Sequence, residues 1–257
     1  MIIPYFLNIV RTILRHFVFY RGYFRMKITY IHHSAFLVEA DSASFLFDYF
    51  EGALPKISSA KPLYVFSSHR HGDHFAEGIF ELAKEQEQIT FILSSDIWQK
   101  RVPAELKEKA VFLDPDQKWS DGLVTVETYK STDEGVAFWC SIDGKEIYHA
   151  GDLNHWYWEG EDPQWNADMT AAYRAEIEKM RGRLADVAFL PLDPRLETWF
   201  YLGLDDWMKV ADAKTVFPMH FWEQFDVAAR LKALPCSESY RDRIVEIQEK
   251  GQEFHVE

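Results

Sequence analysis

Residues 63–74 read LYVFSSHRHGDH, a short apolar run followed at once by a cluster of metal-binding residue types. The run 63–66 has the composition of a buried strand, with Pro62 before it and serines after it. Side chains on a loop that leaves a rigid strand are held in place and can still reach inward. We therefore expect the fold and the chemistry of this chain to be organised around the end of that strand.

The loop after this strand offers several metal ligands within six residues, namely His69, His71, Asp73 and His74. Imidazole and carboxylate together suit zinc, manganese or iron. The His-x-His alternation points two side chains the same way, and Gly72 supplies a bend that turns the second pair around. Four ligands from so short a segment cannot all comfortably serve one ion, so we expect two adjacent sites. A polar loop that merely contains histidines is the alternative, but the chain has only 10 histidines, which makes such clustering an improbable coincidence.

Length and composition indicate a globular protein. The chain has 257 residues, of which 47% are hydrophobic, and this suits one large domain better than two small ones. The net charge of -13 repels phosphate backbones, so we expect a small-molecule substrate and no nucleic-acid partner. Cys140 and Cys236 form no CxxC motif and indicate a reducing, cytoplasmic compartment. The oligomeric state stays open, with a homo-oligomer among the alternatives.

The N-terminal segment 1–26 differs from the rest of the chain. Residues 1–10 are apolar, and the aromatic-rich stretch that follows contains several spaced arginines. A signal peptide has its positive charge before its apolar run, which is the reverse order, and the run is shorter than the roughly 20 residues that span a bilayer. Two interpretations stay open. Residues 1–25 form a basic segment in weak contact with an anionic membrane surface, or Met26 is the true start and the domain occupies 27–257.

Strand and helix patterns come in two successive sets. The first set has strands at 27–40, 44–48, 63–66 and 90–93, and helices at 75–87 and 96–109. The second has strands at 136–141, 146–149, 187–190 and 215–218, and helices at 167–183, 205–213 and 239–250. The Asp-Gly pair between 136–141 and 146–149 indicates a hairpin. This order predicts sheets covered by helices, an α/β or α+β layered domain.

The pattern His-x-His-x-Asp-His after a short strand resembles the signature of the metallo-β-lactamase fold, over about residues 27–220. The resemblance implies a four-layer αββα sandwich with one or two divalent metal ions at one edge, between the sheets. Zinc is expected first, with manganese or iron as alternatives. Within the superfamily the chain looks most similar to single-domain lactonase-like hydrolases related to ascorbate-6-phosphate lactonase, whose early His-Ser plus strand is echoed by residues 33–38.

Further pieces of the family pattern can be matched at strand ends. By resemblance, Asp48 supports the metal loop, Asp152 of a Gly-Asp pair bridges the two metals, and His220 binds the second metal. A turn aspartate is the plain alternative for Asp48. The second site would then comprise Asp73, His74, Asp152 and His220.

One piece of the family pattern is missing. The family normally supplies a first-metal histidine between the ligand run and the Gly-Asp pair, but no histidine lies between His74 and His149. Asp133, Glu134, His155 or a water could fill the gap, or the protein binds one metal. Asp133 and Glu134 are otherwise ordinary turn residues.

Aromatic residues and one arginine follow the expected ligands. Trp156 and Trp222 lie close after Asp152 and His220, so we expect them to wall the site, although core packing or a dimer contact would also explain them. Arg195 is the candidate for binding an anionic group of the substrate, and a salt bridge to Asp193 or Glu197 is the alternative.

These residues predict a metal-dependent hydrolase. A metal-activated water would attack a small ester, lactone or phosphoester, and Asp73 would orient that water or accept its proton. Two alternatives stay open: a catalytically degenerate protein that binds metal or ligand, and a membrane-associated lipid phosphodiesterase docked through residues 1–25.

Overall fold

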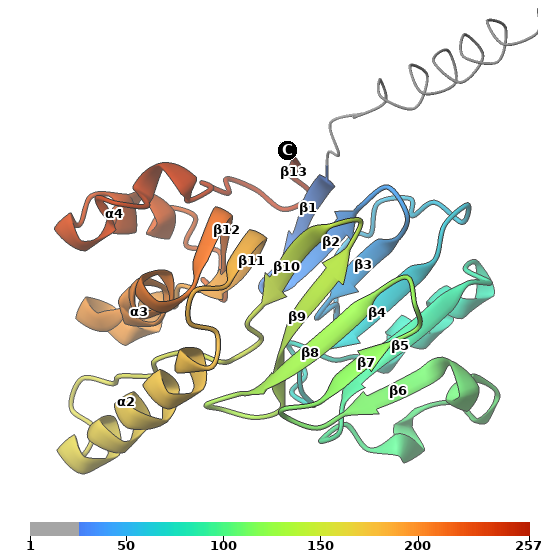
Figure 1. Ribbon diagram of the computed structural model, residues 1–257, viewed down its shortest axis with the longest axis horizontal. Helices are drawn as coiled ribbons and strands as arrows, with labels where there is room; N and C mark the ends of the chain where they lie inside the picture. The colour runs from blue at the N-terminus through green and yellow to red at the C-terminus, as the bar shows by residue number, and fades with distance from the viewer. Residues whose placement is uncertain (1–25) are drawn as a thin grey trace, which may run out of the picture.

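The computed structural model describes residues 26–257, so the expectations for the N-terminal segment lie outside the described residues. Two sheets lie face to face, with helical segments outside them (Figure 1). The four-layer αββα sandwich expected from the sequence is confirmed. Within residues 26–257 no helix has both the length and the apolar character needed to cross a membrane.

The first sheet has seven strands in the order β13-β1-β2-β3-β4-β5-β6. Their bounds are β1 Met26–His32, β2 Ala35–Glu39, β3 Ser44–Phe47, β4 Leu63–Ser67, β5 Ile89–Ser94, β6 Ala110–Leu113 and β13 Glu253–Val256. Strands β3 to β6 run parallel, so their carboxyl ends meet at one edge. Side chains alternate across this sheet, because Phe45 and Phe47 enter the core between the sheets while Leu46 faces the outer helical segments.

The second sheet has six strands in the order β12-β11-β10-β9-β8-β7. Their bounds are β7 Lys118–Ser120, β8 Thr125–Lys130, β9 Val136–Ile142, β10 Lys145–His149, β11 Leu184–Pro191 and β12 Asp212–Met219. The helices on this side are α2 Pro163–Glu178, α3 Leu202–Val210 and α4 Val227–Lys232. Tyr173, Trp207 and Leu231 of these helices are buried in the same core as the sheet.

Several local predictions were wrong. Residues 27–40 form two strands, β1 and β2, joined by a tight turn at His33 and Ser34. The predicted helix 75–87 is the 3-10 segment η1 Glu77–Lys84. The predicted helix 96–109 consists of two 3-10 segments, η2 Gln99–Arg101 and η3 Ala104–Lys109, because Pro103 between them disfavours a continuous helix.

The predicted closing helix 239–250 was also wrong. It retains only the 3-10 turn η6 Arg241–Arg243, after which Ile244 forms an isolated parallel bridge with Val216 of β12. The Val245 N–H donates to the Val216 carbonyl at 2.9 Å, and Ile244 and Ile247 are buried. Spacing of apolar residues at i and i+3 suggested a helix, but burial against the sheet edge determines the conformation. Strands β6, β7 and β13 were not anticipated.

Candidate metal centre

The ligand loop is anchored to the buried residue Asp48, which follows β3. The backbone N–H and the Oγ of Ser68 both donate to the Asp48 carboxylate at 2.7 Å. The N–H groups of His74 and Phe75 then donate to the His71 carbonyl at 3.1 and 2.9 Å, closing a tight turn. Asp48 has a left-handed backbone with φ 43°, a conformation that is uncommon outside glycine and typical of functional sites.

Histidine and aspartate side chains at this edge form two groups, and within each group the potential ligand atoms lie within 4.8 Å of one another. Group A comprises His33, Asp73, His74 and His220. Group B comprises His69, His71, Asp133 and Asp152. The structure thus brings together all six predicted ligands, places Asp133, a candidate for the missing histidine, in group B, and adds His33 to group A.

Asp152 lies between the two groups. Its Oδ2 is 3.5 Å from His69 Nε2, and its Oδ1 is 3.3 Å from His74 Nε2 and 3.5 Å from His220 Nε2. Gly151 before it has φ +52°, and a Cβ there would lie 2.6 Å from the Cβ of Ser68. The backbone at Gly151 must therefore approach the ligand loop closely, which places the Asp152 carboxylate between the imidazoles.

Several buried polar atoms at this place lack a hydrogen-bond partner among the described residues. They are His33 Nε2, His69 Nε2, His74 Nε2 and Asp152 Oδ1. Buried polar atoms are nearly always paired, so a convergent set of unpaired imidazole and carboxylate atoms needs an explanation. Divalent cations of the zinc, manganese or iron type take this set of donors, and the residues therefore fit a metal centre.

Burial sets the protonation of the site. It lowers the pKa of His33 and His69 far below the usual range, and neighbouring imidazoles lower both further, so these rings are neutral and can offer lone pairs. Burial also raises the pKa of Asp152 to about 7. For His220 burial disfavours the charged ring, but the Asp152 and Asp193 carboxylates outweigh it and raise the pKa.

Two buried carboxylates orient the rings of group A. His74 Nδ1 lies 2.7 Å from Asp48 Oδ2, and His220 Nδ1 lies 2.9 Å from Asp193 Oδ2. A carboxylate on one ring nitrogen fixes the orientation of the imidazole and raises the basicity of the other nitrogen.

Asp133 lies where the sequence pattern lacks its histidine, with its Oδ2 3.5 Å from His71 Nδ1. The other candidates for the gap do not join either group. Glu134 accepts from Arg70 Nη2 at 2.5 Å. His155 has both ring nitrogens engaged, one 3.1 Å from Asp206 Oδ2 and one 2.8 Å from Thr170 Oγ1.

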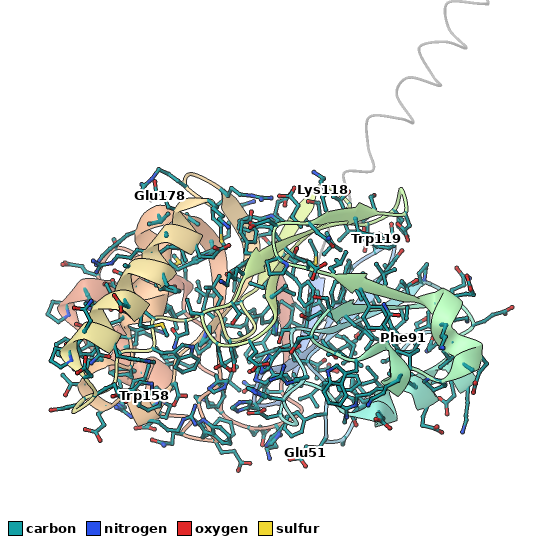
Figure 2. The ribbon with its side chains drawn as sticks, turned by 90° about the horizontal axis from the view of Figure 1, so that it is seen from below. Glu51, Phe91, Lys118, Trp119, Trp158 and Glu178 are labelled. Carbon is teal, nitrogen blue, oxygen red and sulfur yellow. The ribbon has the colours of Figure 1, made fainter. Side chains whose placement is uncertain are left out.

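A cavity of about 270 Å³ opens beside both groups. Its aromatic and apolar wall is formed by Trp156, Trp158, Trp165 and Met169. Trp158 lies beside α2 (Figure 2), where its backbone N–H donates to Asn166 Oδ1 at 3.1 Å. Asp73 and Arg195 also line the cavity. A substrate here would therefore contact residues of groups A and B, the indole wall and the guanidinium of Arg195 together.

Arg195 is fixed in place from several sides. Its Nε and Nη2 donate to the Asp193 carboxylate, at 2.9 and 2.5 Å from Oδ2, as the salt-bridge interpretation predicted. Its guanidinium carbon lies 4.9 Å from the ring centroid of Trp222 and 5.8 Å from that of Trp158. Trp222 is 44% exposed and covers His33, with 4.4 Å between the ring centroids, rather than lining the cavity.

Comparisons with known proteins decide the family. The family model of the beta-lactamase superfamily domain matches residues 27–168, more than half of the chain. The chain belongs to the metallo-β-lactamase superfamily. A UPF0173 metal-dependent hydrolase of Desulforamulus reducens is 29% identical and covers 76% of this chain and 84% of its own length. A second one, of Carboxydothermus hydrogenoformans, is 28% identical over the same shares. The protein is a metal-dependent hydrolase of this superfamily.

Solved structures share the fold of this superfamily member. Igni18, a metallo hydrolase of Ignicoccus hospitalis, superposes with a TM-score of 0.61 at 18% identity, covering 91% of this chain and 99% of its own. YhfI of Bacillus subtilis, a metallo-β-lactamase fold protein, gives 0.59 at 17% identity, covering 90% and 99%. At such low identity these likenesses establish the fold alone.

Sequence reasoning missed three residues of this candidate metal centre. His33 was noticed only as part of a strand motif, and Asp193 only as a partner of Arg195. His149 was placed in a strand, yet its Nδ1 accepts from the Gly151 N–H at 3.1 Å and its Nε2 lies 3.0 Å from the Ser34 carbonyl. Two features of the sequence could have identified such residues. One is a histidine at the turn between two strands, as at His33, and the other is a polar residue that follows a predicted strand, as at Asp193.

Proposed function

We propose that this hydrolase binds two divalent metal ions and cleaves a small ester, lactone or phosphoester that carries an anionic group. The observation that carries the proposal is one cavity lined by both Arg195 and Asp152, whose carboxylate lies 3.5 and 3.3 Å from the unpaired imidazole nitrogens of His69 and His74. Metal binding explains the unpaired atoms. A substrate anion would explain why a cation faces the same cavity.

Each metal ion would be held by one group, with Asp152 between them. Group B would hold the first ion through His69, His71 and Asp133. Group A would hold the second through Asp73, His74 and His220. We expect zinc, with manganese or iron as alternatives because carboxylate oxygens contribute to both groups. When bound, such ions lower the pKa of a coordinated water towards about 7 and polarise the bond to be cleaved.

Asp73 is placed to handle the proton of the attacking water. Its side chain is 33% exposed and lines the cavity, and its Oδ2 lies 3.6 Å from His33 Nε2. A carboxylate at the cavity wall can orient a water molecule through one oxygen and accept its proton.

Arg195 and the tryptophans would position the substrate. Two guanidinium nitrogens bind Asp193, and the remaining N–H groups of the fork, which have no hydrogen-bond partner within residues 26–257, would meet a carboxylate or phosphate in the cavity. The indoles of Trp156 and Trp158 would pack against the apolar part of the substrate and exclude water.

A hydrolysis panel tests the proposed function. Matched esters, lactones and phosphoesters, each with and without a carboxylate group, are assayed with the full chain before and after treatment with a chelator. We expect turnover to fall at least about 100-fold on chelation and to return when zinc, manganese or iron(II) is added. Turnover that survives complete metal removal contradicts the proposal.

Arg195→Lys tests the anion contact separately. Lysine keeps the charge but lacks the planar fork, so KM for anionic substrates should rise about tenfold while that for neutral analogues stays unchanged. Arg181→Lys is the matched control, because Arg181 pairs with Glu178 at a surface remote from the cavity lining. An equal effect of Arg195→Lys on charged and neutral substrates would show that Arg195 acts only on the structure.

A further inference from the structure

We propose that the two ions bind with very different strength: group A, with His33 as a fourth protein ligand, retains one ion tightly, while group B, with Asp133 as a ligand, holds an exchangeable one. The inference rests on the proposed dinuclear centre and concerns its assembly. It assigns ligand roles to two residues, His33 and Asp133, that the ligand run, the Gly-Asp pair and the late histidine do not include.

His33 has the geometry of a ligand. Its side chain is 2% exposed, and its Nε2 has no hydrogen-bond partner among the described residues. Its ring centroid lies 4.1 Å from that of His220 and 5.7 Å from that of His74. Buried imidazole nitrogens without a partner, such as Nε2 of His33 and of His74, are costly unless a cation uses their lone pairs.

The backbone around His33 is built to hold that position. His33 occupies the β1–β2 turn with φ 54°, and His220 likewise has φ 61°. The His33 N–H donates to Tyr30 Oη at 3.0 Å, and its carbonyl accepts from the His220 N–H at 3.3 Å. Left-handed residues other than glycine persist only where the surroundings enforce them, and here the two of them face each other.

The rigid surroundings of group A favour tight binding. The side chains of His33, His74 and His220 are at most 3% exposed. His74 and His220 are oriented by the buried carboxylates of Asp48 and Asp193. These three imidazoles are already in place, so Asp73, with a side chain 33% exposed, is the one ligand of group A that an ion would still have to order.

Group B lacks these constraints. The side chains of His71 and Asp133 are 44% and 43% exposed and lie 3.5 Å from each other at the mouth of the site. Only His69 and Asp152 of this group are buried. Water and chelators can reach an ion held by two exposed side chains, and those side chains lose freedom when they bind it. The ion in group B should therefore exchange first.

Metal counting tests this directly. The full chain is loaded with Co²⁺ or Zn²⁺, dialysed against a weak chelator and measured by elemental analysis. Isothermal titration of the metal-free protein gives both dissociation constants. We expect one equivalent to be retained, and two constants that differ at least about 100-fold. Loss of both ions together, or equal constants, overturns the proposal.

Variants then assign each ion to its group. Asp133→Ala should remove the exchangeable equivalent and leave the retained one, and Asp133→His should tighten the weak constant. Glu134→Gln is the matched control, since Glu134 is the adjacent turn residue and pairs with Arg70. Asp133→Ala with both equivalents unchanged overturns the role of Asp133.

His33→Asn tests the fourth ligand. Asparagine tolerates a left-handed backbone, so the turn is preserved while the imidazole is lost. The tight constant should weaken about 10–100-fold, with an altered Co²⁺ absorption spectrum. An unchanged tight constant in a folded variant overturns the role of His33. These readouts are independent of turnover, so equal constants would refute the inference while chelator-sensitive hydrolysis still supported the proposed function.

Discussion

The carboxylate of Asp193 holds two side chains that serve different parts of the proposed reaction. It lies 2.9 Å from His220 Nδ1, and it accepts from both the side chain and the backbone N–H of Arg195. Its side chain is fully buried. One residue thus couples a proposed metal ligand to the proposed substrate cation, and moving it would disturb both.

Asp193→Asn should therefore impair metal binding and catalysis together. The amide keeps the shape but removes the charge that orients His220, and loss of such a partner costs about 10–100-fold in metal affinity or activity. Metal titration and kcat/KM provide the measurement. Asp205→Asn is the control, because Asp205 is also buried but binds Tyr240 Oη at 2.9 Å in a different part of the fold. The idea fails if Asp193→Asn binds metal and turns over substrate like the wild type.

The sequence could predict the ligands that lie in a local pattern, and it could not predict those that depend on packing. His69 to His74 form one run, and Asp152 and His220 directly follow apolar runs. Their assignment as ligands stays a prediction, although the structure gathers them at one edge. His33 was missed because its position depends on a left-handed turn and on contact with His220, near the other end of the chain.

At the scale of elements, apolar runs identified the central strands well and the peripheral segments poorly. Strands β4, β9, β10, β11 and β12 lie where the pattern predicted them, because buried strands need continuous apolar residues. Residues 239–250 have helical spacing, but Ile244 forms an isolated bridge with Val216 of β12, and no local pattern predicts such a tertiary contact. The short β6 and β7 carry half-buried residues whose pattern is too weak to distinguish from loop.

Gly135 joins two elements of the site, since it ends the turn that carries Asp133 and directly precedes β9. It has φ +68°, and a Cβ there would lie 2.0 Å from the Ser68 carbonyl oxygen, just before the ligand loop. The Val136 N–H donates to that same carbonyl at 2.9 Å. Contact between glycine and backbone therefore sets the distance between Asp133 and His71.

Gly135→Ala should push the turn away from the ligand loop. We expect a loss of more than about 1 kcal/mol in the free energy of unfolding and a weaker exchangeable metal site. Gly144→Ala is the control that separates backbone strain from steric crowding. Gly144 has a similar φ of +72°, but no atom lies within 4 Å of the position that its Cβ would take. Denaturant unfolding and metal titration of both variants provide the comparison. Identical effects of the two substitutions would argue against the close approach at Ser68.

At the scale of the whole molecule, the candidate centre connects the two sheets. His33, Asp48 and the ligand run come from the edge of the seven-stranded sheet, while Asp152 and His220 follow strands of the six-stranded sheet. Without a cation, the buried Asp152 carboxylate has an oxygen with no partner among the described residues. Metal ions held between the groups would both relieve that cost and cross-link the layers.

Removal of metal should therefore destabilise the entire sandwich. A ligand that binds only the folded state, at 100 times its Kd, adds about 2.7 kcal/mol, and for a chain of this size each kcal/mol shifts Tm by about 2–4 °C. We expect chelation to lower Tm by at least about 5 °C, measured by calorimetry at fixed pH. Asp152→Ala removes the donor between the groups and the unpaired carboxylate but leaves the ligands of group A, so the chelator should shift Tm clearly less than in the wild type. If chelation lowers Tm equally in the wild type and in Asp152→Ala, Asp152 contributes nothing to the metal-dependent link between the two sheets.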